Sequence, residues 1–254
     1  MNHYSATHRI GYRQCRGCHT AIKHLSNIVK RGNTEGIIKA DISGFFDNIS
    51  KKKLMDMLGI RIQDKYFLMY IKRWLESGIL NDKNAEDIYH GTPQGDVISP
   101  VLGNIYLHYV LDEWFETYIK QHYHNVELIR YCDDFLCCCN NRDEADEVLD
   151  EITVRLSKYD LKLSDKKTKT LDFNCCNHPQ FNFLGFSINH IYKDTISVKT
   201  SYKKQQQKMD KISEVISTTI TNHRHLCNND IVPIIIDKLN DTLRGWYSYY
   251  RYWN

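Results

Sequence analysis

The sequence predicts an α+β fold, in which a split β–α–β unit forms an antiparallel sheet with packed helices and a small helical domain follows. Two short apolar runs, 127–131 and 135–139, flank the pair Asp133-Asp134, which is typical of a buried β-hairpin with a polar tip. Beyond residue 200 the chain changes to two long stretches with helical spacing of apolar residues. We therefore expect a domain of strands and helices first and a helical domain after it.

Helix-capping and helix-breaking residues predict where the individual helices and strands begin and end. A helix over 18–31 ends at Gly32-Asn33, and the following strand, 35–42, brings Asp41 to its end. Ser50 and Asp64 are typical helix N-caps. The helix that begins at Ser50 is expected to run through about residue 58 and the one at Asp64 through about residue 77, and further helices are expected over 98–120, 143–157, 202–222 and 230–252. A short hairpin is expected in 78–90. Strands are expected over 161–163, 169–173, 181–188 and 195–199.

The composition is that of an ordinary globular protein, with 42% hydrophobic and 26% charged residues among 254. No apolar run approaches the roughly 20 residues that span a bilayer, and the N-terminus has no stretch of signal-peptide type. We therefore expect a cytoplasmic protein with no membrane partner. The nine cysteines fit small core residues. The alternative is a zinc site formed by Cys15-x-x-Cys18-His19 and Cys175-Cys176-x-His178, which rests on ligand type alone.

Positive charge is concentrated in a few segments although the net charge is only +3. Residues 1–34 contain six Lys or Arg and no Asp or Glu, and further lysines cluster in 162–169 and 199–211. The acids gather instead in 143–151. Such segregation favours a polyanionic partner such as a nucleic acid, which is bound through counterion release. Solvated surface faces would give the same runs, so both interpretations stay open at this point.

Asp133 and Asp134 repel each other at the tip of an apolar hairpin, where an unpaired carboxylate is costly. A divalent cation would relieve this repulsion, and the alternative is a solvated Asp-Asp turn. Asp41, at the end of the first strand, is expected at the same edge of the sheet. Three carboxylates and a triphosphate balance about two Mg²⁺ ions, and two such ions clamp the attacking and leaving oxygens in phosphoryl transfer.

Several segments, in the family's order, resemble the motifs of reverse transcriptases of the group II intron and maturase type. Residues 40–49 and 91–107 resemble the first two palm motifs, and 131–134 resembles the YxDD box. Residues 163–168 resemble the fourth motif, 183–186 the primer grip and 239–250 the thumb helix. This resemblance implies a right-hand polymerase palm followed by a helical thumb. The implied domains are a basic remnant of the fingers over 1–34, the palm over 35–200 and a partial thumb over 201–254.

The resemblance also implies roles for individual residues. Metal ligands would be Asp41, Ile42 (through its carbonyl), Asp133 and Asp134, and Lys167 would assist the leaving pyrophosphate. The nucleotide would contact Ile42, Phe46, Gln94 and Gly95, and the primer grip would be Phe183, Leu184, Gly185 and Phe186. Nucleic acid would contact Arg9, Arg13, Arg16, Lys203, Lys204 and Lys208. A plain core position for Phe46 and a solvated Lys167, with Lys166 equally placed, are the alternatives.

The implied function is an RNA-directed DNA polymerase that adds dNTPs to the 3′-hydroxyl of a DNA or RNA primer on an RNA template, with two Mg²⁺ or Mn²⁺ ions. Alternatives are a non-catalytic maturase that binds intron RNA, an inactive fragment of a longer reverse transcriptase, and a two-metal nucleotide cyclase, which the thumb motif disfavours. The sequence departs from the family at Asp96 and Cys132, where small residues are usual. Most of the fingers and the end of the thumb are expected to be missing, which puts the activity of this chain by itself in question.

Overall fold

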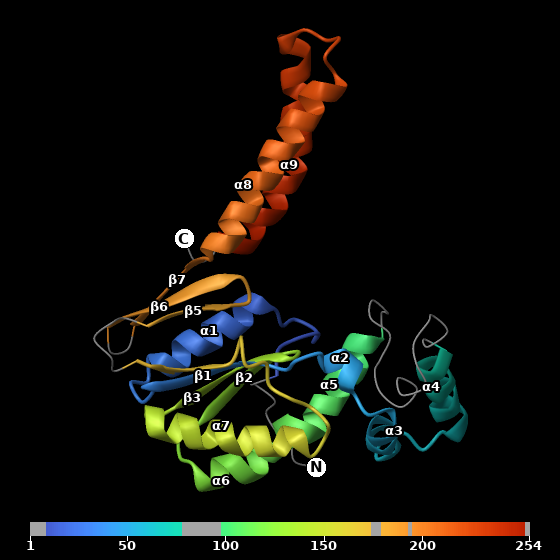
Figure 1. Cartoon of the computed structure of the whole chain (residues 1–254), viewed down its shortest axis with the longest axis vertical. Helices are drawn as coiled ribbons and strands as arrows, with labels where there is room; N and C mark the ends of the chain where they lie inside the picture. Colours follow the sequence, from blue (N-terminus) through green and yellow to red (C-terminus); the bar gives the residue numbers. More distant parts are fainter. Residues whose placement is uncertain (1–8, 78–97, 174–178, 193–194, 252–254) are drawn as a thin grey trace. The chain divides into compact units, whose positions relative to one another are not determined.

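The computed structural model describes residues 9–77, 98–173, 179–192 and 195–251, and the chain divides into two compact units, 1–175 and 176–254 (Figure 1). The first unit holds a four-stranded sheet with helices, and the second holds a three-stranded sheet and two long helices. The domain boundary predicted near residue 200 falls inside the second unit, between its sheet and its helices. The functional domain ranges therefore stay predictions.

The sheet of the first unit has the strand order β2-β3-β1-β4, with antiparallel neighbours. Its strands are β1 (Gly36–Asp41), β2 (Glu127–Tyr131), β3 (Asp134–Cys139) and β4 (Lys169–Asp172). The predicted hairpin is confirmed, because β2 and β3 pair from the position where Tyr131 lies opposite Asp134. β1 lies between β3 and β4, with Asp41 directly opposite Asp134. This register brings the acidic end of the first strand to the acidic tip of the hairpin.

Local capping chemistry sets helix boundaries in this unit. The Ser50 side chain accepts a hydrogen bond from Lys53 N, and the Asp64 carboxylate accepts from the backbone N–H groups of Tyr66 and Phe67, as N-caps do. The described α-helices of the unit are α1 (Cys18–Val29), α2 (Phe45–Asn48), α3 (Lys51–Gly59), α4 (Lys65–Ser77), α5 (Ser99–Leu107), α6 (Lys120–His122) and α7 (Arg142–Ser157). Both predicted N-caps are confirmed.

The helix expected over 98–120 forms, but part of it has π-helical hydrogen bonding. The segments η2 (His108–Asp112) and η3 (Phe115–Ile119) lie between α5 and α6. A π-turn changes which side chains face the sheet, and apolar spacing does not reveal it. Two smaller differences are that the short helix α2 was not expected and that the strand predicted over 161–163 is only an isolated bridge. The hairpin expected in 78–90 lies outside the described residues.

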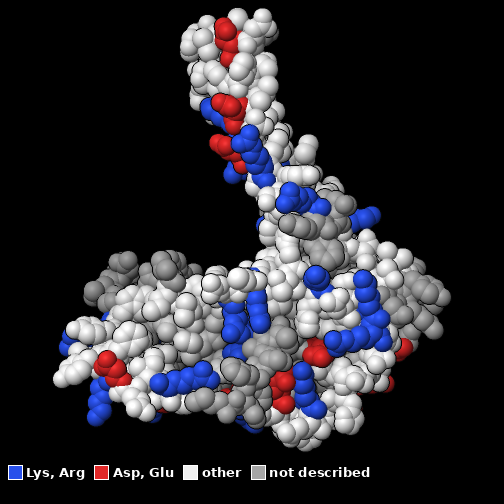
Figure 2. All heavy atoms as spheres, turned by 180° about the vertical axis from the view of Figure 1, so that it is seen from behind, with Lys and Arg blue, Asp and Glu red and all other residues white. Residues whose placement is uncertain are grey.

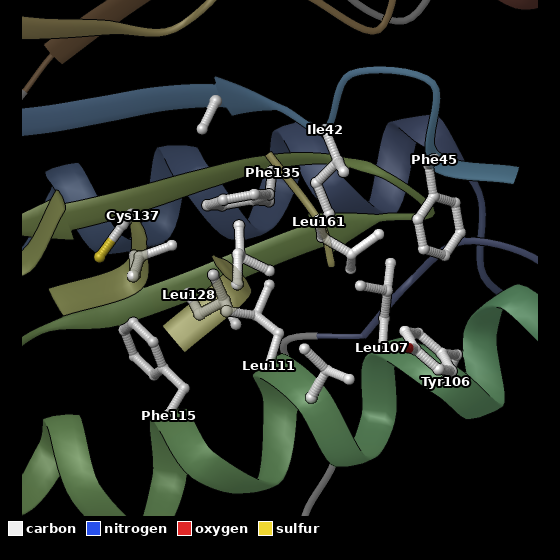
Figure 3. Packing of buried hydrophobic residues seen from close by; sticks show 14 of the residues in the cluster. Ile42, Phe45, Tyr106, Leu107, Leu111, Phe115, Leu128, Phe135, Cys137 and Leu161 are labelled. Carbon is white, nitrogen blue, oxygen red and sulfur yellow. The ribbon is translucent and has the colours of Figure 1, made fainter. Parts of the chain in front are cut away.

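The sheet is buried on both faces, following the two-residue period of its strands. Phe135 and Cys137 of β3 belong to one core together with α5, η2 and α7, whereas Leu136 and Cys138 are buried on the other face. Figure 3 shows this first core, with Phe135 and Cys137 on the side of the sheet that faces Leu111. α1 packs against β2 outside this core (Figure 1). Burial on both faces explains why the hairpin strands are nearly continuous apolar runs.

The second unit contains β5 (Gln180–Phe183), β6 (Phe186–Tyr192), β7 (Thr195–Thr200), α8 (Tyr202–Asn222) and α9 (Asn228–Tyr250). The single strand expected over 181–188 is wrong, because the chain reverses at Leu184-Gly185. Both residues have positive φ, 50° and 83°, which is typical of a two-residue hairpin turn. A leucine at the first of these positions hides the turn in the sequence. Although α8 and α9 are long, no helix in the described residues is both long and apolar enough to cross a membrane.

Candidate functional site

The β2–β3 turn fixes the position of the acidic pair. Because Tyr131 pairs with Asp134, only Cys132 and Asp133 form the turn. Cys132 has a φ of 59°, in the left-handed region that favours glycine, so a side chain there is strained. Its carbonyl accepts a 2.9 Å hydrogen bond from Arg130 Nη1, and its side chain is buried. The packing beneath the turn, rather than a glycine, therefore holds this unusual conformation.

Asp41 and Asp134 lie on the same side of the sheet, because directly opposed residues on neighbouring strands point the same way. Alternation along the strands places this side opposite to the core that contains Ala40 and Phe135. Asp41 is only 6% exposed, and Asp133 precedes Asp134 in the turn. The structure thus brings together the three aspartates that the sequence selects.

These carboxylates disfavour one another's charge. Burial raises the pKa of Asp134 to about 6, and the charges of Asp41 and Asp133 and a hydrogen bond with Asp41 add to this effect. Burial also raises the pKa of Asp133; a backbone hydrogen bond opposes the shift, and the charge of Asp41 reinforces it. An acidic cluster with raised pKa values is poised to gain stability from a bound cation.

Lys167 is the cation that the chain itself supplies to this cluster. Its Nζ donates a 2.8 Å hydrogen bond to Asp41 Oδ2, and this contact raises the pKa of Lys167. The lysine is carried by a loop that lies along the end of β1, where Ser164 N donates to the Asp41 carbonyl at 2.8 Å. The side chain of Lys167 is 63% exposed, so this ion pair is readily exchanged. Of the two adjacent lysines in the predicted motif, the described contacts to Asp41 single out Lys167 rather than Lys166.

The donor chemistry of the cluster fits a divalent cation such as Mg²⁺, which prefers carboxylate oxygens. Among the described residues, the ammonium group of Lys167 bonds to Asp41 and the charge of Lys39 acts on Asp134, so three carboxylates still leave an excess of negative charge at a largely buried site. The side chains are not gathered around one point, since no group of three His, Cys, Asp or Glu among the described residues already encloses an ion position. Asp41 is instead bonded to Lys167 and to Asp134. The residues present therefore fit a metal ion after their side chains reorient.

Without divalent ions, the first unit is expected to lose stability as the pH rises. Asp134 has a folded-state pKa of about 6 against an ordinary value of 3.8. Its contribution to stability is therefore complete below a pH of about 4 and is lost as the pH rises through 6. The expected fall in the free energy of unfolding is about 2 kcal/mol. Urea unfolding in a chelator at pH 4.5 and 7 measures it.

The matched variant for this experiment is Asp134→Asn, which cannot ionise. Its unfolding free energy should change less between the two pH values than that of the wild type, and Mg²⁺ should reverse part of the wild-type loss at pH 7. An identical pH dependence in both proteins would contradict the role given to Asp134.

Phe46 lies in α2, half-buried, with its ring centroid 5.0 Å from that of Phe45. Gly103 of α5 makes this packing possible, since a Cβ there would lie 2.8 Å from Phe45 Cε1 and 3.1 Å from Phe46 Cε1. Phe45 is buried in the core next to α5, as Figure 3 shows. Phe46 is partly accessible, which is compatible with either of the two roles considered for it.

Some predicted site residues lie outside the described part of the chain. Gln94 and Gly95 are among them, so their contacts to a nucleotide stay predictions. The same holds for residues 175–178, half of the zinc alternative. In the other half, Cys15 is exposed and Cys18 is half-buried, and neither belongs to a metal-binding group within the described residues.

The predicted primer grip, 183–186, is a tight turn packed against the end of α9. Tyr249 Oη donates a 3.0 Å hydrogen bond to the Leu184 carbonyl, and the rings of Phe186 and Tyr249 stack 5.4 Å apart. Gly185 is required here, because φ is 83° and a Cβ would lie 2.9 Å from Tyr250 Oη. The tyrosines at the end of α9 thus support the turn.

The predicted nucleic-acid contacts in the second unit lie along α8. Lys203 and Lys204 are exposed at its start, and Figure 2 shows Lys and Arg side chains along the helical pair, interspersed with acidic ones. Lys208 is half-buried, and its contact to nucleic acid stays a prediction. Its Nζ donates a 2.7 Å hydrogen bond to the Thr242 carbonyl, so this ammonium group joins α8 to α9.

Sequence reasoning missed a buried ion pair beneath the β2–β3 turn. Arg130 is 1% exposed, and its Nε and Nη2 donate to the two carboxylate oxygens of Asp112 at 2.7 and 2.6 Å. Arg130 Nη1 also donates to Asn104 Oδ1 and to the Cys132 carbonyl, and Asn104 Nδ2 donates to the Gly11 carbonyl. The available sequence signal was an arginine within the apolar run 127–131, where a charge needs a partner.

The N-terminal basic residues are attached to this network. Arg9 forms an isolated parallel bridge with Arg130, and Ile10 N donates to the Arg130 carbonyl at 3.0 Å. Arg16 Nη1 donates to the Arg9 carbonyl, whereas Arg13 is exposed. The segment expected to be a remnant of the fingers therefore extends the edge of the sheet beside β2.

Comparison with known proteins agrees with this geometry. Residues 5–188 match the family model described as reverse transcriptase (RNA-dependent DNA polymerase). An uncharacterised 91 kDa protein in the cob intron of Schizosaccharomyces pombe is 26% identical over 95% of this chain and 37% of its own length. The group II intron-encoded protein LtrA of Lactococcus lactis subsp. cremoris is 38% identical over 39% of this chain and 16% of its own length. The chain thus spans well under half of these relatives.

Solved structures show the same fold. Telomerase from Candida albicans, in complex with the TWJ fragment of telomeric RNA, superposes with a TM-score of 0.59 at 16% identity, over 95% of this chain and 43% of that one. The predicted α+β right-hand polymerase fold is therefore confirmed. From the match over most of its length, the chain belongs to the reverse transcriptase family, with relatives among group II intron-encoded proteins.

Proposed function

We propose that this chain contains the palm and part of the thumb of an RNA-directed DNA polymerase, which transfers nucleotides from dNTPs to a primer 3′-hydroxyl on an RNA template. The observation that carries the proposal is the pairing of Asp41 with Asp134, next to Asp133, at the ends of two neighbouring strands in a chain that matches the reverse transcriptase family. Buried carboxylates that repel one another give the fold no benefit by themselves. Their presence together in this arrangement supports binding of divalent cations.

The three aspartates would hold two Mg²⁺ or Mn²⁺ ions, with the Ile42 carbonyl as a further oxygen ligand. When bound, such ions stabilise the negative charge that develops on the transferred phosphoryl group. Asp41 and Asp134 lie at the ends of the two central strands and Asp133 lies in the tight turn, so the backbone places the negative charge, while the side chains reorient when an ion binds. Rigid placement of the backbone lowers the reorganisation needed during the reaction.

Other side chains of the chain would bind and orient the substrate. The Lys167 ammonium, 2.8 Å from Asp41, is available to stabilise or protonate the leaving pyrophosphate once it leaves that carboxylate. The Phe46 ring would lie under the incoming sugar and exclude a 2′-hydroxyl by its bulk. Gln94 and Gly95 would contact the nucleotide, and the turn 183–186 would support the primer end.

Nucleic-acid binding would use basic residues of both units. Arg9, Arg13 and Arg16 in the first unit and Lys203 and Lys204 in the second are the proposed contacts to the template and primer. Cationic side chains bind phosphates without reading sequence, so they set affinity and position.

A maturase that binds folded intron RNA without catalysis is the second candidate. Relatives whose names place them in introns favour it. The acidic cluster disfavours it, because RNA binding gains nothing from three neighbouring carboxylates. An inactive fragment of a longer reverse transcriptase would keep the fold and lose turnover.

The test is primer extension on an RNA template with Mg²⁺ and dNTPs, comparing the wild type with Asp41→Asn. Extension by the wild type and its loss in the variant would support the polymerase. Tight, salt-dependent RNA binding by both proteins without extension would support the maturase. Neither binding nor extension would indicate an inactive fragment.

A further inference from the structure

A cavity of about 240 Å³ lies in the first unit, beside the β2–β3 turn. Its wall is formed by the N-terminal segment, the turn between α3 and α4, α5 and η2. The wall includes four arginines, Arg9, Arg13, Arg61 and Arg130, and no described lining residue is acidic. The charge of the lining residues favours an anionic ligand in this cavity.

The positive charge of the cavity is only partly balanced. Asp112 is the carboxylate that pairs with Arg130, and Arg9 Nε lies 3.5 Å from the same Asp112. Within the described residues, no carboxylate lies within 4 Å of the guanidinium groups of Arg13 or Arg61. Within the described residues, Asp112 is therefore the carboxylate at ion-pair distance from these guanidinium groups, and it contacts two of the four.

Two buried polar atoms at the cavity make no hydrogen bond within the described residues, although one of them, Arg9 Nε, forms a 3.5 Å ion pair with Asp112. The other is His108 Nδ1, and both atoms are shielded from solvent. Burial lowers the pKa of His108, the charges of Arg9 and Arg61 lower it further, and the charges of Asp112 and Glu113 oppose the shift; the net lowering favours a neutral imidazole. Buried groups of this kind are normally satisfied by a ligand or by water. An anion in the cavity would accept from Arg9 Nε, and from His108 in the tautomer that carries its proton on Nδ1.

The ligand chemistry follows from the donors and from a neighbouring aromatic ring. Guanidinium groups match the oxygens of a phosphate in a fork geometry. Tyr12 also lines the cavity, with a 60% exposed ring, and the ring of Tyr131 lies 6.4 Å away. An exposed aromatic ring next to arginines is the usual arrangement for binding unpaired nucleotides. The cavity is too small for a folded macromolecular element but admits one phosphate with its sugar.

We propose that this cavity binds a backbone phosphate of a single-stranded nucleic acid, with the attached base stacked on Tyr12. The cavity wall is continuous with the acidic turn. A Cβ at Gly11 would lie 2.7 Å from Cys132 N, and Asn104 Nδ2 donates to the Gly11 carbonyl at 2.9 Å. The bound strand is thereby anchored next to the aspartates. The inference rests on nucleic acid being the substrate of the proposed function, and it adds Arg61, His108 and Tyr12 as binding residues.

The experiment measures binding of a fluorescently labelled single-stranded RNA to the full chain by anisotropy, in a chelator and without dNTPs. Arg61→Gln should raise the Kd about five- to tenfold and reduce the slope of log K against log salt by about 0.7. Arg61 is exposed, so the substitution leaves the fold intact. The matched control is Arg73→Gln, an exposed arginine of α4 outside the cavity, which should change the Kd less than about twofold.

A second variant separates the stacking part of the proposal. Tyr12→Leu should raise the Kd at least about fivefold while leaving the salt slope unchanged, because stacking involves no counterion release. Inorganic pyrophosphate, titrated calorimetrically, tests a free phosphate as the source. Binding of pyrophosphate that depends on Arg61, with unchanged RNA affinity in Arg61→Gln, would overturn the assignment to a nucleic-acid strand.

Equal RNA affinity of Arg61→Gln and Arg73→Gln would also overturn the proposal. Because the assay contains no metal ion and no nucleotide, its result does not depend on polymerase activity. A chain that binds RNA through Arg61 but fails to extend a primer would refute the proposed catalytic function and leave the phosphate site standing.

Discussion

Replacement of Asp133 by Asn is expected to lower the rate of primer extension by up to about 1000-fold without destabilising the protein. Asn keeps the size of the side chain at the tip of the turn but removes the negative charge that would hold a divalent cation. Loss of one preorganised group that stabilises charge in the transition state commonly lowers the rate about 10²- to 10³-fold. Because Asp133→Asn removes the charge of a metal ligand without changing its size, we expect its effect in the upper part of that range. The proposed role of the acidic turn therefore predicts a large effect on the rate.

The same substitution should leave the free energy of unfolding equal or higher in a chelator. Burial and the charge of Asp41 raise the pKa of Asp133, so the ionised carboxylate opposes folding at neutral pH. Single-turnover extension and urea unfolding of the same preparation give the two readouts. Asp150→Asn, which removes an exposed carboxylate on α7, is the charge-matched control and should change neither. Activity of Asp133→Asn within about tenfold of wild type would sink the proposed catalytic role.

Arg130→Met is expected to destabilise the first unit by about 3–5 kcal/mol, the largest stability effect among the substitutions considered. The substitution leaves Asp112 buried, with its oxygens deprived of the 2.7 and 2.6 Å hydrogen bonds from Arg130. It also removes the 2.9 Å hydrogen bond to the Cys132 carbonyl, which supports the strained turn. Urea unfolding followed by circular dichroism measures the loss.

The double variant Arg130→Met with Asp112→Leu separates ion-pair energy from the cost of an isolated charge. Replacing both partners by apolar side chains should restore most of the stability, since the desolvation cost of the charges disappears with them. Arg142→Met is the control, because its ion pair with Asp146 on α7 is exposed and should be worth less than about 1 kcal/mol. A loss in Arg130→Met no larger than in this control would contradict the structural role of the pair.

Much of the fold follows from local sequence chemistry. Ser50 and Asp64 act as N-caps because their side-chain oxygens reach backbone N–H groups within the next turn. The hairpin around Asp133 is equally local, since two apolar strands and a two-residue turn lie next to each other in the chain. The prediction of one continuous strand failed at Leu184-Gly185. Contacts with Tyr249 and Tyr250 support a turn there, and leucine is not a residue type that indicates a turn in the sequence.

The candidate site divides in the same way. Residue types and order were enough to select Asp41, Asp133 and Asp134, because adjacent carboxylates in apolar surroundings require an external charge partner. The sequence did not distinguish Lys167 from Lys166, because that choice depends on how a loop lies along β1.

The sequence by itself determined the family and the α+β fold class and selected the acidic residues of the candidate site, since each depends on motifs or on neighbours in the chain. Only the tertiary structure decided that Arg130 is neutralised by Asp112 and that Arg9 and Arg61 line one cavity. These residues are far apart in the chain, and their charges interact only because folding brings them within a few ångströms in a medium that screens them poorly. Sequence order carries the identity of such groups but not the distances on which their energies depend.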